Sequence, residues 1–84
     1  MAKIYILLVH QVSDCEDIRL DATPYTDYDE AKKVFDDIVS DETKFAETKG
    51  WEFDDDNDDT YFCTFESGRF CENNTVVQLN EEEI

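Results

Sequence analysis

Residues 3–12 form an unbroken run of mostly apolar side chains, KIYILLVHQV. In the middle of this run both alternating sets of positions are apolar: Ile4, Ile6 and Leu8 in one set, Tyr5, Leu7 and Val9 in the other. Strand side chains alternate between the two faces of a sheet. Two apolar sets therefore indicate burial on both faces, or burial on one face and an oligomer interface on the other. We predict a central strand over residues 3–12.

Residues 13–26 show no such pattern. Their charges are scattered, Pro24 interrupts them, and the apolar residues follow neither a period of two nor one of 3.6. This composition is typical of a connecting loop. We expect Ile18, Leu20 and Tyr25 to anchor that loop against the core.

Residues 27–49 carry the clearest helical pattern. Apolar residues recur three and four positions apart, at Ala31, Val34, Phe35, Ile38, Val39, Phe45 and Ala46. Asp27 is a favourable N-cap, Lys49 in the last turn meets the negative end of the helix dipole, and Gly50 can adopt the left-handed conformation that ends a helix. We predict one amphipathic helix over residues 27–49.

Beyond Gly50 the pattern changes to short strands. Residues 51–53 and 60–66 alternate as strands do, and the acidic run 54–59 between them is a loop. Ser67-Gly68 indicates a two-residue hairpin turn, so the returning strand is expected to begin at Phe70. Residues 80–84 form a short acidic tail.

The predicted fold class is α+β, with the element order β-α-β-β-β in one domain spanning residues 1–84. One helix packs on one face of a three- to four-stranded, mostly antiparallel sheet. A single helix covers only one face, and the predicted strands are rich in aromatic residues. We therefore expect a homodimer through an apolar sheet face as one possible assembly.

The charge of the chain limits the classes of partner that it can bind. Twenty-three Asp and Glu against seven Lys and Arg give a net charge of −16, yet 40% of the 84 residues are hydrophobic and 13% aromatic, which favours a folded protein over a disordered one. Direct binding to nucleic acid or to an anionic membrane is disfavoured because both repel such a chain. Residues 50–84 alone carry a net charge of −10.

The sequence offers little for catalysis. His10 is the only histidine, and two glycines cannot make a phosphate-binding loop. We therefore expect no enzymatic activity, no catalytic residue and no cofactor. The three cysteines contain no paired metal-ligand spacing, so we expect no structural metal site and reduced thiols. The apolar stretch Ile4–Val9 is too short for a signal peptide, which predicts a cytoplasmic protein.

The acidic loop also matches part of a calcium-binding pattern. With Asp55 as position 1, Asn57, Asp59 and Glu66 fall at positions 3, 5 and 12 of an EF-hand. Thr60 stands where that loop needs glycine, and the flanking segments are predicted strands rather than helices. Weak divalent-cation binding remains an alternative.

The acid excess points to a partner with a basic surface. We expect the binding residues in the loop, then in the tail, then on the helix: Asp54, Asp55, Asp56, Asp58, Asp59, Glu81, Glu82, Glu83, Asp37 and Asp41. In size, charge and lack of catalytic groups the chain resembles the small acidic proteins with which phages and mobile elements mimic nucleic acid. That resemblance implies inhibition of a host defence or DNA-processing factor. The alternative is a small accessory or dimeric interaction domain whose charge serves solubility.

Overall fold

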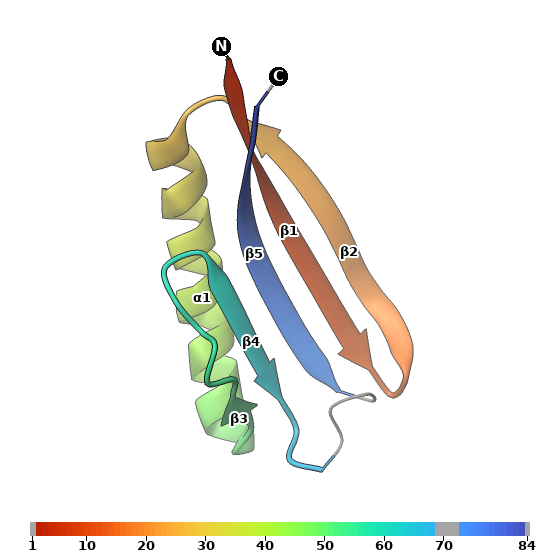
Figure 1. Ribbon diagram of the computed structural model, residues 1–84. Helices are drawn as coiled ribbons and strands as arrows, with labels where there is room; N and C mark the ends of the chain where they lie inside the picture. The colour runs from red at the N-terminus through yellow and green to blue at the C-terminus, as the bar shows by residue number, and fades with distance from the viewer. Residues whose placement is uncertain (1, 69–72, 84) are drawn as a thin grey trace.

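The computed structural model describes residues 2–68 and 73–83 and shows one helix packed on one face of a five-stranded antiparallel sheet (Figure 1). The elements are, in chain order, β1 (Lys3–Ser13), β2 (Glu16–Tyr25), α1 (Tyr28–Lys49), β3 (Glu52–Phe53), β4 (Tyr61–Phe65) and β5 (Asn74–Glu83). The strand order in the sheet is β2-β1-β5-β4-β3. The predicted α+β class is confirmed. The sheet has five strands rather than three to four, and the element order is β-β-α-β-β-β.

The additional strand is β2, so the prediction of a loop over 13–26 is wrong. Asp14 and Cys15, with φ of 52° and 67°, form a tight turn, and β2 then pairs with nearly the whole of β1. Because β2 is an edge strand, all of its side chains except Tyr25 are exposed, and Ile18 and Leu20 are 62% and 72% exposed. Backbone pairing holds this strand in place, and such pairing leaves no hydrophobic pattern in the sequence.

The predicted acidic tail is also part of the sheet. β5 continues to Glu83, which pairs with Lys3. The tail prediction was wrong because β1 supplies a backbone partner to the very end of β5, and exposed acidic side chains are tolerated there.

The hairpin between β4 and β5 is longer than the predicted two-residue turn. Phe65 pairs with Asn74, and the Glu66 N–H donates to the Asn73 carbonyl at 3.1 Å. The predicted strand start at Phe70 lies outside the described residues.

The helix prediction is confirmed. Asp27 is the N-cap, and its carboxylate accepts a hydrogen bond from the Asp29 N–H at 3.0 Å. Gly50, at φ 72°, ends the helix in the left-handed conformation, where a side chain would be strained. Between these caps, Ala31, Phe35 and Ala46 are buried.

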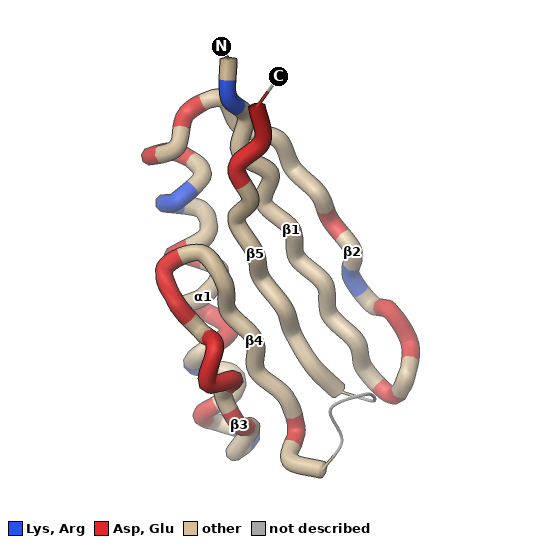
Figure 2. Tube along the Cα trace, viewed as in Figure 1, with Lys and Arg blue, Asp and Glu red and all other residues tan. Residues whose placement is uncertain are grey.

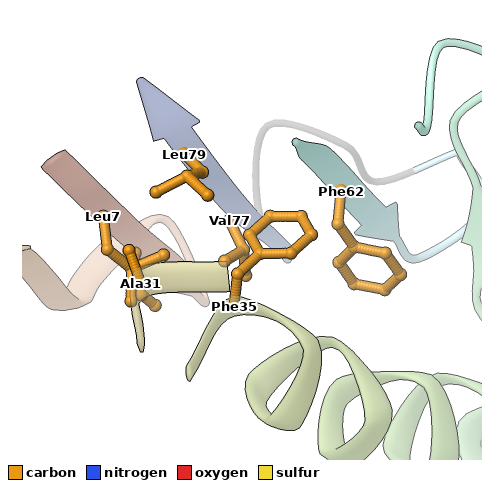
Figure 3. Close-up of a cluster of buried hydrophobic side chains, with 7 residues drawn as sticks. Leu7, Ala31, Phe35, Phe62, Val77 and Leu79 are labelled. Atoms are coloured by element: carbon orange, nitrogen blue, oxygen red, sulfur yellow. The ribbon is translucent and has the colours of Figure 1, made fainter. Parts of the chain in front are cut away.

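The core lies between α1 and the three central strands (Figure 3). Its members come from β1, α1, β4 and β5 and are Leu7, Val9, Ala31, Phe35, Phe62, Val77 and Leu79. The register sets Leu7 opposite Leu79, Val9 opposite Val77 and Phe62 opposite Val77, so these side chains share the helix side of the sheet. The intervening residues of each strand point away from the helix, to what we call the open face. No described element packs over the open face as α1 does over the other (Figure 1).

Candidate functional site

The acidic loop 54–59 is held in one conformation by its own side chains. The Asp54 carboxylate accepts hydrogen bonds from the Asp56 N–H at 2.9 Å and from the Tyr61 hydroxyl at 3.3 Å. The Asp58 carboxylate accepts from the Thr60 and Tyr61 N–H groups, each at 2.9 Å. These hydrogen bonds to the charged form hold the pKa of Asp58 below its usual value, and the bond from the Thr60 N–H has the largest effect. Asp54 and Asp58 therefore shape the loop.

Asn57 fastens the middle of the loop to the outer edge of β4. Its Nδ2 donates to the Cys63 carbonyl at 3.1 Å, and its Oδ1 accepts from the Cys63 N–H at 2.8 Å. The Asp54 N–H also donates to the Cys63 carbonyl, at 3.0 Å. The carboxamide thus takes the place of a neighbouring strand, which leaves the backbone of the buried Cys63 satisfied.

The remaining loop carboxylates, those of Asp55, Asp56 and Asp59, are exposed, and no described residue donates a hydrogen bond to them. Asp55 lies in a shallow hollow of about 410 Å³ at the β3 edge of the sheet. The hollow is lined by Glu52, Phe53, Asp54, Asp55 and Phe65. Carboxylates beside aromatic rings suit a cationic side chain, because both attract positive charge.

Glu52 was missed by the sequence analysis. It precedes the acidic run, and the pairing of Glu52 with Phe65 brings it to the same hollow. The strand pattern around Trp51 and Phe53 gave no sign of this placement, because β3 could have paired on either side. Only the β3–β4 register brings Glu52 to the loop.

Glu81, Glu82 and Glu83 are the last three residues of β5 and lie close to the N-terminal end of the chain (Figure 2). Lys3 approaches Glu81 at 3.6 Å, and both side chains are about half exposed. The Leu79 N–H donates to the Thr60 carbonyl at 2.8 Å, which extends the β4–β5 ladder beyond Tyr61. This bond brings the Asp59 end of the acidic loop beside the part of β5 that leads into Glu81. The other end of the loop lies with Phe65, which pairs with Asn74 at the start of β5, so the loop runs along β4 away from the Glu81–Glu83 group (Figure 1).

The third predicted group lies on the helix. Asp37 and Asp41 are exposed and one turn apart on α1. Neighbouring Asp36 is paired with Lys32. No described contact joins Asp37 or Asp41 to the loop or to the end of β5.

The EF-hand-like spacing does not fold as an EF-hand. The carboxamide of Asn57, at position 3, is bonded to the Cys63 backbone, and the segment between Asp59 and Glu66 is strand β4. Within residues 2–68 and 73–83 no group of three His, Cys, Asp or Glu side chains is arranged to hold a metal ion.

A second cavity, which the sequence did not reveal, lies between the C-terminal half of α1 and the β1–β2 hairpin. It measures about 270 Å³, and its lining includes Ile18, Glu42, Phe45 and Trp51. The Phe45 and Trp51 rings meet edge to face at 5.1 Å. Burial raises the pKa of Glu42, an effect opposed by the hydrogen bond that Gln11 Nε2 donates to its carboxylate at 2.8 Å.

Among the described groups with chemical reactivity, His10 is paired with a carboxylate, Cys63 is buried and Cys15 is exposed. His10 Nε2 lies 2.9 Å from the Asp17 carboxylate in an exposed pair at the hairpin end of β1 and β2. Cys15 and Cys63 are free thiols, and burial raises the pKa of the Cys63 thiol. Burial, with Cys63 and Asp54 as neighbours, raises the pKa of Tyr61 to about 12. Cys71 lies outside the described residues.

Comparison with protein-family models, curated proteins and solved structures finds no match to this chain. The described part of the chain contains no helix long and apolar enough to cross a membrane.

Proposed function

We propose that this protein is a non-enzymatic, cytoplasmic binding protein whose acidic loop and strand end engage the basic surface of a nucleic-acid-binding protein. In this role it occupies the surface that the nucleic acid would use, and it thereby inhibits a DNA-processing or defence factor.

The observation that carries the proposal is the construction of the loop. Asp54, Asn57 and Asp58 fix the backbone through hydrogen bonds, and the carboxylates of Asp55, Asp56 and Asp59 are left to solvent. Charges already held in place lose little conformational entropy on binding, whereas charges on a disordered tail lose more. A fixed acidic array is what a mimic of regularly spaced phosphates requires.

The position of the second acidic group supports the same surface. The Thr60–Leu79 hydrogen bond joins the loop to β5 just before Glu81, and Glu52 adds a carboxylate at the opposite end of the loop. Figure 2 shows negative charge at two places, along the loop and at the end of β5, where Lys3 lies beside Glu81. The excess of negative charge at both places steers a basic partner toward them.

The test is affinity capture with the immobilised full chain. A bacterial lysate is applied at low salt and the column is eluted with duplex DNA. We expect DNA to release nucleic-acid-binding proteins, because mimic and DNA compete for one basic surface. Recovery of no DNA-displaceable protein would contradict the proposal.

A matched pair of variants locates the surface. The triple variant Asp55→Asn, Asp56→Asn, Asp59→Asn removes three charges without touching the hydrogen bonds that shape the loop. At about 0.2–1 kcal/mol for each exposed ion pair, binding should weaken by about 3- to 150-fold. The control removes three exposed charges elsewhere, by Glu16→Gln, Glu30→Gln and Glu47→Gln. Equal weakening by both variants would show that net charge, not the loop, governs binding.

A further inference from the structure

We infer that the open face of the sheet binds a second copy of this chain, forming a twofold-symmetric dimer with the two sheets face to face. This assembly is separate from the acidic surface proposed above, because the apolar centre of the open face contains none of the acidic residues proposed there.

The open face, which α1 does not cover, carries apolar side chains that are partly or largely exposed. Ile6 and Leu8 of β1 and Val76 of β5 are only partly buried, and Leu20 of β2 is 72% exposed. These residues explain the second apolar set of positions in residues 3–12: Leu7 and Val9 lie under the helix, and their neighbours lie on the open face. A sheet face of this composition in water indicates a protein contact.

The open face is also free of charge over its centre. Three adjacent cross-strand rows contain no Asp, Glu, Lys or Arg, although 36% of the chain is charged. The rows are Pro24, Ile6 and Asn80; Ala22, Leu8, Gln78 and Tyr61; and Leu20, His10, Val76 and Cys63. The nearest carboxylates meet these rows at their edges: Asp17, which pairs with Val12, lies 2.9 Å from His10 Nε2, and Asp54 accepts a hydrogen bond from the Tyr61 hydroxyl. Glu82 lies one row further out, where it pairs with Ile4.

This charge distribution favours a second copy of the chain as the partner that binds the open face. A basic partner is recognised by clustered carboxylates, and the rows themselves contribute none; the carboxylates of Asp17 and Asp54 reach them only at the edges. A second copy of the chain carries −16, so it approaches most easily where both surfaces carry the least charge, and the centre of the open face meets that condition. A twofold axis through the face sets the same apolar rows against each other and keeps Glu82, Asp17 and Asp54 toward the rim, where water screens them.

The size of the face is consistent with a dimer that dissociates on dilution. From Ile4 to Val12 the face is about 26 Å long at about 3.3 Å per residue; β1, β2 and β5 run nearly this whole length at about 4.8 Å of width each, and β4 covers about half of it. Each copy then contributes about 440 Å², for a total of about 900 Å², which is in the range of weak, transient interfaces. Packed sheets lie about 10 Å apart, a distance that the side chains of these rows can fill.

Sedimentation equilibrium of the full chain over a wide concentration range tests the inference. We expect a monomer–dimer equilibrium that shifts toward dimer as salt is raised, because salt screens the repulsion between two acidic copies. Leu20→Glu should weaken dimerisation at least tenfold. A monomer at every concentration and salt level would overturn the inference.

Ile18→Glu is the matched control. Ile18 lies on the same strand and is 62% exposed, but the bulge between Gln11 and Val12 turns it to the helix side, where it lines the cavity with Glu42. The Ile18→Glu substitution should leave dimerisation unchanged. If Ile18→Glu and Leu20→Glu have equal effects, or neither has any, the dimer uses another surface and the inference is wrong.

The salt response separates this inference from the proposed function. Binding of a basic partner weakens as salt rises, whereas the dimer strengthens. Leu20→Glu should retain DNA-displaceable capture, and the triple loop variant should retain dimerisation. Loss of one property with retention of the other therefore shows which of the two proposals has failed.

Discussion

Replacing Asn57 by alanine tests the account of the acidic loop most directly. The side chain makes two hydrogen bonds to the backbone of Cys63, a residue with no exposed surface. Without Asn57 the Cys63 carbonyl keeps its bond from the Asp54 N–H, but the Cys63 N–H loses the partner that the structure gives it. Loss of the hydrogen bond at the Cys63 N–H therefore costs more than loss of the bond at the Cys63 carbonyl.

The magnitude follows from these two bonds. A buried donor left unsatisfied costs about 1–3 kcal/mol, and loss of the second, replaceable bond costs about 0.5–1.5 kcal/mol. Allowing water to reach part of the edge, we expect Asn57→Ala to lower the free energy of unfolding by about 2–3 kcal/mol. For a chain of this length that corresponds to a fall in Tm of roughly 8–24 °C.

The assay is urea and thermal denaturation followed by circular dichroism. Asp59→Ala serves as the control, because it lies in the same loop with an exposed side chain and should change stability by less than about 0.5 kcal/mol. If Asn57→Ala is as stable as that control, the carboxamide does not hold the loop to β4. The case for a fixed acidic array would then fail as well.

Three further outcomes are expected. Burial raises the pKa of Glu42 in the folded chain above the pKa that it has in the unfolded chain. Ionisation of Glu42 therefore destabilises the folded state once the pH exceeds the pKa of the unfolded chain. Glu42→Gln should therefore raise the urea midpoint at neutral pH, and this gain should vanish below about pH 4; a gain that persists there would contradict the assignment. Phe35→Ala should cost about 3–5 kcal/mol because Phe35 is only 2% exposed, and Phe45→Ala, at a side chain 43% exposed, should cost less than half as much in the same denaturation assay. In the native protein a thiol reagent should modify Cys15 and spare Cys63, as read by mass spectrometry of peptides; equal modification would refute the burial of Cys63.

Local signals in the sequence specified several elements well. The three-and-four spacing of apolar residues, together with Asp27 and Gly50, predicted α1 to within one residue at its N-terminus and correctly at its C-terminus. The two-sided apolar pattern of residues 3–12 predicted β1 as a central strand. These features depend on neighbouring residues and on a fixed repeat, so they are visible without knowledge of the fold.

Other features depend on partners that are distant in the chain. β2 and the end of β5 are strands because β1 pairs with both of them, and their exposed side chains carry no repeat that reveals it. The same applies to the candidate site. The sequence identified the acidic run, but only the tertiary structure divided it into Asp54 and Asp58, whose carboxylates bind the backbone, and three exposed carboxylates.

By itself, then, the sequence determined the α+β class, the helix with its caps, and the concentration of negative charge in residues 50–84. The tertiary structure decided that the loop is fastened through Asn57, that Glu52 joins it, and that the centre of the open face is free of charge. The physical reason is the same in each case. Helix periodicity and net charge are local or additive properties of a chain, whereas hydrogen-bond partners and the composition of a sheet face are set by strand register, which forms only when distant segments pair.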